Sequence, residues 1–172
     1  EDSVGVNSGT DMIFDHCSFG WSIDEVFSIT QNYHHRGLLD NITVQWCIVA
    51  EPLNESWQHW DPKEKYHGFC SLVQGGHNTQ YTYHHNLYAN ALDRMPRLGN
   101  DDDTSIDPDG WLIDWRNNVV YNWGRGNAGY TDDAQSITHQ NFVNNYYLTG
   151  PDSQDSRIYK EVGGYNLGYY GG

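Results

Sequence analysis

Long apolar runs and basic residues are both scarce in this sequence of 172 residues. No stretch approaches the roughly 18 consecutive apolar residues of a transmembrane helix, so we expect no membrane span. Lys and Arg total 9 against 23 Asp and Glu, and the net charge of −14 argues against nucleic-acid binding, which requires a basic surface. The same charge opposes a polyanionic ligand unless a bound cation reverses it locally.

Cysteine is scarce as well, because Cys17, Cys47 and Cys70 are the only three. An odd number without zinc-like spacing predicts no disulfide framework. The chain opens on "EDSVGV", which resembles the middle of a strand, and closes on the Gly/Tyr-rich "GGYNLGYYGG". We therefore expect a single domain over 1–172 that is a fragment cut at both ends, with an irregular tail over 150–172. A missing signal peptide then carries no information.

Amphipathic helical patterns are also hard to find, whereas short strand-like runs recur throughout the chain. Five of these runs superpose without gaps: "MIFDHCSF", "ITVQWCIV", "YTYHHNLY", "IDWRNNVV" and "QNFVNNYY". Almost all residues at their first and third positions are able to face a core, and most residues at their second and fourth positions are polar. This alternation predicts strands with one buried face in register.

The sixth letter of these runs is always Cys or Asn. We expect a left-handed turn at this position and a ladder of side chains through the stacked coils, built by Cys17, Cys47, Asn86, Asn118 and Asn145. A β-sandwich would explain the alternation but not the recurring position. The repeat therefore predicts an all-β fold, a right-handed parallel β-helix.

Three acidic residues near the start of the chain are candidate metal ligands. Asp2 lies in an early predicted strand, and Asp24 and Glu25 lie in "WSIDEVFSI". If one coil brings these positions together, their carboxylates offer the hard oxygen ligands that Ca²⁺ prefers. The alternative is that they are solvated loop residues.

Two of the few cations, Arg94 and Arg97, flank Pro96 in "RMPR". Guanidinium groups pair with carboxylates in a bidentate manner, so the pair suits an anionic sugar. The alternative is a pair of surface salt bridges to Asp93 or to the acidic loop at 101–103.

Four segments together resemble the pectate lyase family of polysaccharide lyases, which are right-handed parallel β-helix enzymes. They are "MIFDHCSFGWSIDEVFSI", "NITVQWCIVAEPL", "YTYHHNLYANALDRMPRL" and "WLIDWRNNVVYNWG". The most specific pieces are "FDHCSF" and "HHNLYANALDRMPR". The resemblance extends over residues 1 to 148.

The resemblance implies a role for each matching residue. Arg94 falls on the family's catalytic arginine and Arg97 on an arginine that binds a substrate carboxylate. Asp2 and Asp24 fall on calcium carboxylates. A third calcium carboxylate falls on Ser28, so the missing ligand shifts to Glu25 or is lost.

Two further family positions are less well matched in this sequence. A substrate-binding lysine belongs in "KEKYHGFCSL", where Lys65 and His67 are both candidates. A further family arginine falls on Gly99 and is absent.

The family's activity is the cleavage of polygalacturonate or pectin by calcium-assisted β-elimination, with an arginine as the base. The resemblance implies Ca²⁺ as cofactor, a secreted or periplasmic location and a monomer. Non-catalytic carbohydrate binding and a pectin-type lyase without calcium stay open as alternatives.

Two other classes fit the sequence less well. A glycoside hydrolase needs two carboxylates flanking the bond, and neighbouring residues such as Asp24 and Glu25 point to opposite faces of a strand. A zinc site built on the nine His lacks helical spacing in the His pairs at 34/35 and 84/85.

Overall fold

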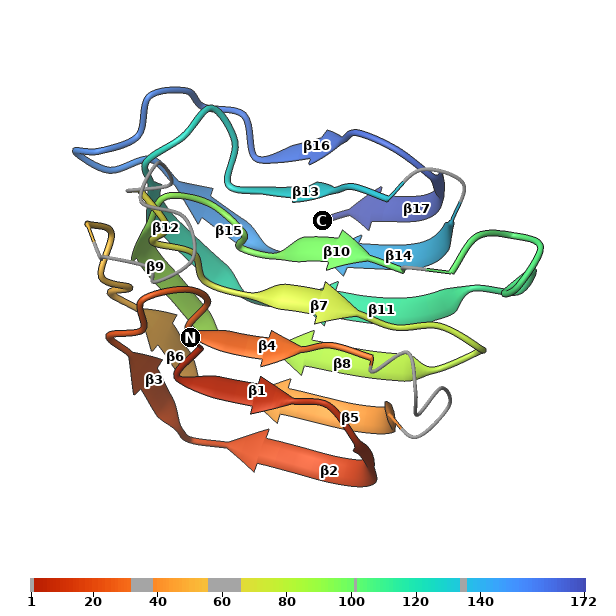
Figure 1. Ribbon diagram of the computed structural model, residues 1–172. Coiled ribbons are helices and arrows are strands. Elements are labelled where there is room, and N and C mark those ends of the chain that lie inside the picture. Colours follow the sequence, from red (N-terminus) through yellow and green to blue (C-terminus); the bar gives the residue numbers. More distant parts are fainter. Residues whose placement is uncertain (1, 32–38, 56–65, 101, 134–135) are drawn as a thin grey trace.

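The computed structural model describes residues 2–31, 39–55, 66–100, 102–133 and 136–172. Across these residues the regular structure consists of strands alone, arranged in three parallel sheets (Figure 1). The predicted all-β parallel β-helix is confirmed. None of the described segments forms a helix long and apolar enough to cross a membrane.

The chain visits the three sheets in turn and then begins the next coil. Sheet A contains β1 (Val4–Val6), β4 (Phe27–Ile29), β7 (Leu72–Gln74), β10 (Arg97–Gly99), β13 (Gly129–Thr131) and β16 (Tyr159–Glu161). Sheet B contains β2 (Gly9–Asp15), β5 (Leu39–Gln45), β8 (Gln80–His84), β11 (Trp111–Arg116), β14 (Ile137–Val143) and β17 (Tyr165–Gly171). Sheet C contains β3 (Ser18–Gly20), β6 (Ile48–Ala50), β9 (Leu87–Ala91), β12 (Val119–Trp123) and β15 (Tyr146–Leu148).

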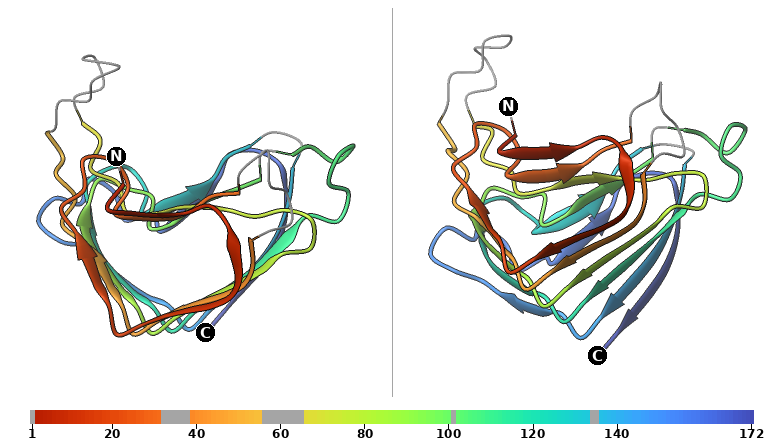
Figure 2. Two further views of the ribbon diagram at one scale, coloured as in Figure 1. Left: turned by 60° about the horizontal axis from the view of Figure 1, so that its bottom comes forward. Right: turned by 90° about the horizontal axis from the view of Figure 1, so that it is seen from below.

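The register between coils is the one that the repeat predicts. Val44 of β5 pairs with Phe14 of β2 and with Tyr83 of β8, and Tyr83 pairs in turn with Trp115 of β11. Each is the third letter of its run. The three sheets surround a common interior (Figure 2). Val44, Tyr83 and Trp115 belong to the buried core, and Phe14 packs against it. Sheet B therefore buries one face and leaves the other partly exposed.

Large aromatic side chains fill this interior. Trp115 is fully buried, and its ring stacks on Tyr83 with 5.3 Å between centroids. On the next coil Phe142 lies 6.2 Å from Trp115. Because aligned positions repeat along the stack, each ring packs on the ring of the neighbouring coil, and the core continues from coil to coil.

The predicted side-chain ladder runs through the turn between sheets B and C. The Asn118 side-chain oxygen accepts bonds from the Asn86 backbone N–H (2.9 Å) and amide (3.1 Å), and the Asn118 amide donates to the Asn145 oxygen (3.2 Å) and to the Tyr83 carbonyl (3.0 Å). On the two preceding coils, the Cys47 N–H donates to the Asn86 side-chain oxygen (2.9 Å), and the Cys17 N–H donates to the Cys47 sulfur (3.4 Å). The ladder therefore satisfies buried backbone donors that no strand can reach.

The left-handed turn lies one residue earlier than the sequence suggested. The residue before each ladder position has a positive φ: 54° at His16, 52° at Trp46, 56° at His85, and 52° at Asn117 and Asn144. This turn points the following side chain inward, so Cys or Asn serves as a buried bonding group rather than as the left-handed residue itself.

The Gly/Tyr-rich end of the chain is more regular than we expected from its composition. Instead of an irregular tail over 150–172, it contributes β16 and β17, which pair with β13 and β14. The reason is that a parallel neighbour supplies a template of backbone donors and acceptors, which outweighs the weak strand preference of glycine.

We predict that Asn118→Ala lowers the free energy of unfolding by about 3 kcal/mol, because it leaves buried groups on two neighbouring coils without partners. Urea denaturation followed by far-ultraviolet circular dichroism measures this change. The matched control is Asn7→Ala, which removes an exposed amide with a single side-chain bond to Thr30. Equal losses in the two variants would contradict the importance of the ladder.

The three cysteines are free, and their burial predicts an order of thiol labelling. Cys17 is half-buried, whereas Cys47 and Cys70 are buried, so Cys17 should react first. Burial raises the pKa of Cys47 and of Cys70, so both thiols should react slowly, and Cys70 only on unfolding. Mass spectrometry after timed labelling gives the order. Labelling of Cys70 in the native protein as fast as that of Cys17 would be inconsistent with the core described here.

Candidate functional site

The predicted site residues gather at the ends of the sheet A strands where the chain enters from sheet C. Asp2 lies two residues before β1, rather than inside a strand, and Asp24 and Glu25 precede β4. Glu25 forms a parallel bridge with Phe69, and Phe69 forms one with Asp93. Arg94 follows Asp93, so these bridges bring three coils side by side at one edge (Figure 1).

The carboxylates of Asp2, Asp24 and Glu25 converge in this place. One ligand atom from each lies within 4.8 Å of the others. Asp24 and Glu25 share this cluster although they are neighbours in sequence, because Asp24 lies in a bend just before the bridge residue Glu25 and the two are not part of one extended strand. The sequence argument that separated them to opposite faces was wrong for this reason.

The cluster fits a hard divalent cation. Carboxylate oxygens bind Ca²⁺ at about 2.3–2.6 Å, so oxygens 4.8 Å apart are able to share one ion. Burial raises the pKa of Asp2, and the charge of Asp24 acts in the same direction. The carboxylates therefore repel each other across a partly desolvated space, which a cation would relieve. Ser28 is only 1% exposed and supplies no charge.

Arg94 lies directly beside this cluster. Its Nη1 forms an ion pair with Glu25 Oε1, and its guanidinium covers the Phe69 ring at 4.0 Å. The backbone at Arg94 is left-handed, with φ of 60°, and its carbonyl accepts a bond from the Ser71 N–H (2.7 Å). Burial lowers the pKa of Arg94, and the charge of Arg97 acts in the same direction, against the opposing effect of Tyr130.

Arg97 begins β10 and points to a different carboxylate. Its Nη2 donates to Asp133 Oδ1 at 3.0 Å, and its guanidinium lies 6.0 Å from the centre of the Tyr130 ring. A Cβ at Gly99 would lie 1.8 Å from Asp133 Oδ2, so a side chain at that position would displace the carboxylate that Arg97 contacts. The two arginines therefore pair with Glu25 and Asp133, and not with Asp93 as the alternative interpretation held.

Sequence reasoning missed the platform that holds this site together. Phe69 is buried, with Arg94 on its ring at 4.0 Å and Arg125 at 5.1 Å. Arg125 is paired with the buried Asp93 at 3.2 Å. Burial raises the pKa of Asp93, and Arg125 opposes that rise. Only the register between coils brings these residues together. The local sequence around Phe69 therefore does not indicate that its ring contacts two arginines.

Of the two candidates for the lysine position, His67 is placed at the site. Its Nδ1 lies 2.7 Å from Asp24 Oδ1, and its ring lies 4.5 Å from the Phe69 ring. Lys65 lies outside the described residues. His67 thus contacts the acidic cluster itself, which ties its orientation to Asp24.

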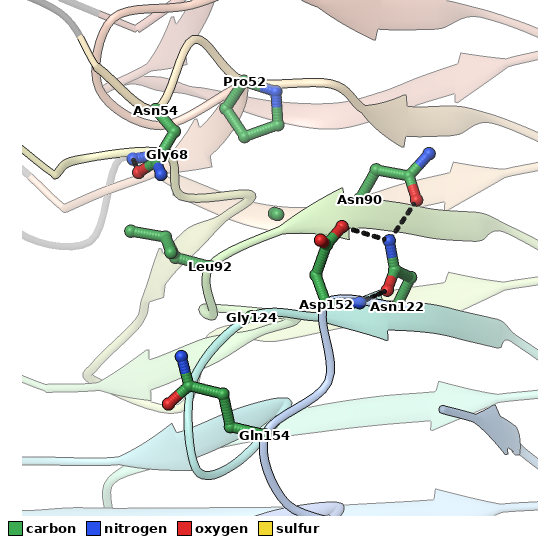
Figure 3. Close-up of a pocket in the computed structure, with 10 residues that line it drawn as sticks. Pro52, Asn54, Gly68, Asn90, Leu92, Asn122, Gly124, Asp152 and Gln154 are labelled. Atoms are coloured by element: carbon green, nitrogen blue, oxygen red, sulfur yellow. Dashed lines mark hydrogen bonds between the residues drawn. The ribbon is translucent and has the colours of Figure 1, made fainter. Parts of the chain in front are cut away.

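A cavity of about 370 Å³ lies close by, on the sheet C side (Figure 3). Asn122 forms part of its wall, and the Asn122 side-chain amide donates hydrogen bonds to the side-chain oxygens of Asn90 and Asp152, each at 2.9 Å. The remaining lining is made by further amides, glycines and small apolar side chains, without an arginine. The cavity is therefore separate from the arginine and carboxylate cluster.

Comparison with known proteins confirms the resemblance to pectate lyases. No protein-family model matches the chain. The chain is 31% identical over 153 residues to a probable pectate lyase C of Aspergillus terreus and 32% identical over 155 residues to one of Neosartorya fischeri, in both cases over 89% of this chain and 29% of the relative. A pectate trisaccharide-lyase of Thermotoga maritima is 29% identical over 97 residues, 56% of this chain and 23% of that protein. The chain thus spans less than a third of the length of these relatives.

We predict that Asp24→Asn weakens Ca²⁺ binding by about tenfold, because affinity at such sites follows the number of charged ligands. Isothermal titration calorimetry of the protein with Ca²⁺ measures the change. Asp109→Asn is the matched control, since Asp109 is exposed and lies outside the cluster. Equal affinity in the Asp24 variant and in the wild type would rule out Asp24 as a ligand.

Proposed function

We propose that this homologue of the pectate lyases cleaves polygalacturonate by β-elimination. The observation that carries the proposal is the ion pair of Arg94 with Glu25, whose carboxylate converges with those of Asp2 and Asp24 at one edge of sheet A. Arg97 follows three residues later, at the start of β10. An arginine pair recognises a carboxylate, and an acidic cluster recruits a cation that binds the same group. Together they suit an anionic sugar polymer in spite of the chain's net negative charge.

The substrate chemistry requires a base and charge neutralisation. Each galacturonate unit carries a carboxylate at C6, and the C5 proton lies alpha to it. In the elimination the C5–H electron pair becomes the C4=C5 double bond, and the C4–O pair leaves with the glycosidic oxygen, which takes up a proton. The product is an unsaturated uronide, and no water is consumed.

Arg94 is the proposed base for the C5 proton. Guanidinium normally stays protonated, so a base role requires a lowered pKa. Burial and the nearby charge of Arg97 both act in that direction. The Phe69 ring beneath the guanidinium and the fixed backbone at Arg94 supply the orientation that proton transfer needs.

Arg97 is the proposed carboxylate-binding residue. It already pairs with Asp133, which shows that its guanidinium is oriented for an oxygen anion. A uronate would replace or share that contact, whereas a methyl ester would offer no charge. The arrangement thus favours unesterified polygalacturonate over methylated pectin. His67, held against Asp24, is a second candidate for substrate contact.

Asp2, Asp24 and Glu25 are the proposed cation ligands. A Ca²⁺ ion bound there would supply positive charge against the sugar carboxylate as the C5 proton is lost. All these side chains come from one chain, so we propose that the protein acts as a monomer. A polymeric substrate too large to enter a cell implies a secreted or periplasmic protein.

We predict that Arg94→Ala lowers lyase turnover on polygalacturonate by about 10³-fold, within the range for loss of a general base. Arg94→Lys should also be poor, because an ammonium lacks the planar fork. The ultraviolet absorbance of the unsaturated product, followed with and without a chelator, measures the rate. The control is Arg116→Ala, an exposed arginine at the end of β11 on sheet B.

Two results would argue against the proposal. Retention of more than about a tenth of wild-type turnover in Arg94→Ala, a barrier change of ~1.4 kcal/mol, would remove Arg94 from the base role. Binding of the polymer without any unsaturated product in the wild type would favour a non-catalytic carbohydrate-binding protein instead.

A further inference from the structure

Glu25 belongs to two groups at once. Its carboxylate is one of the three that converge within 4.8 Å, and it is also the ion-pair partner of Arg94. Its side chain is 5% exposed, so water screens it little. The proposed base and the proposed cation site therefore depend on the same buried anion.

A cation and the guanidinium compete for this carboxylate. Ca²⁺ in the cluster would lie within about 2.6 Å of a Glu25 oxygen, next to the guanidinium that now contacts it. Two positive charges this close in a poorly screened space repel each other strongly. Asp2 and Asp24 remain available to the cation, but no other ion pair holds Arg94 among the contacts of the described residues.

The Arg94 side chain is able to leave Glu25 while its backbone stays in place. The hydrogen bond from the Ser71 N–H (2.7 Å) holds the Arg94 carbonyl, and the guanidinium carbon lies 4.0 Å from the centre of the Phe69 ring. In the paired position Arg94 Nε is buried and has no hydrogen-bond partner within the described part of the chain. The Glu25-bound position therefore leaves a donor unsatisfied, which lowers the cost of moving to another anion.

We propose that Glu25 is exchanged between Arg94 and the cation. In the cation-free protein Glu25 holds the guanidinium against the acidic cluster. Cation binding takes over Glu25 and frees the guanidinium to face the substrate. This inference rests on the cation site of the proposed function, and it adds that the cation and Arg94 oppose each other's binding to Glu25.

The test is a double-mutant cycle read out by Ca²⁺ affinity, measured calorimetrically without substrate. Arg94→Ala should tighten Ca²⁺ binding by about fivefold or more, the lower range of measured couplings between sites. Glu25→Gln should weaken it. In the Glu25→Gln background, Arg94→Ala should tighten binding much less, because the competition for the Glu25 carboxylate is gone and only the direct repulsion between the two cations remains.

Two further variants make the cycle specific. Arg97→Ala removes the same charge from a residue paired with Asp133, so it should change Ca²⁺ affinity less than Arg94→Ala. Arg94→Gln keeps most of the side-chain length and repeats the test if the alanine variant fails to fold. Near-ultraviolet circular dichroism checks folding in each variant.

The outcomes separate this inference from the proposed function. Unchanged affinity in Arg94→Ala and Arg94→Gln, or a gain that persists fully with Glu25→Gln, would overturn the exchange while leaving the cation site in place. A wild-type protein that binds no Ca²⁺ in the millimolar range would overturn both the site and the exchange. Lyase activity of the wild type is measured separately and tests the reaction itself.

Discussion

The fold depends on one buried interaction, the bonding of each ladder side chain to the backbone of the neighbouring coil. A tight turn between two sheets leaves N–H and C=O groups inside the molecule, where unpaired polar groups are costly. Asn86, Asn118 and Asn145 satisfy these groups from one coil to the next. The same bonds fix the register of sheets B and C, and sheet A follows because each coil is a continuous chain. The alignment of Glu25, Phe69 and Asp93 across coils is a consequence of that register.

The electrostatics of the site explain why an acidic protein places cations together. Three of its nine Lys and Arg residues, Arg94, Arg97 and Arg125, lie around Phe69 and Tyr130, and each has a carboxylate partner. Pairing lowers the cost of burying these charges and holds the guanidinium planes in fixed orientations. The anionic ligand that we propose would meet oriented groups, although it would have to displace internal carboxylates to reach them. Affinity in such a site reflects a difference between two ion pairs rather than the strength of one.

Much of the fold and part of the site were readable from the sequence. Alternation and the recurring Cys or Asn predicted the strands, their register and the ladder, because both patterns are local and repeat. The predicted position of the left-handed residue was wrong by one residue. His and Trp, which occupy it at His16 and Trp46, are not residue types that mark such a turn. The family resemblance pointed to Arg94 and Asp24, but no local signal revealed Phe69 or the sharing of Glu25. Those contacts join residues far apart in the chain, and only the stacked register creates them.

The spacing of the ladder has a consequence for how such a protein can change. Successive ladder positions are separated by 30, 39, 32 and 27 residues, yet each bonds to the next in the same way. Length differences are therefore absorbed in the connections between sheets, while every coil keeps its neighbours. Insertions and deletions in one connection can reshape the surface beside the arginines without altering the interior. Stability and ligand preference are thus free to vary on separate parts of the same coil.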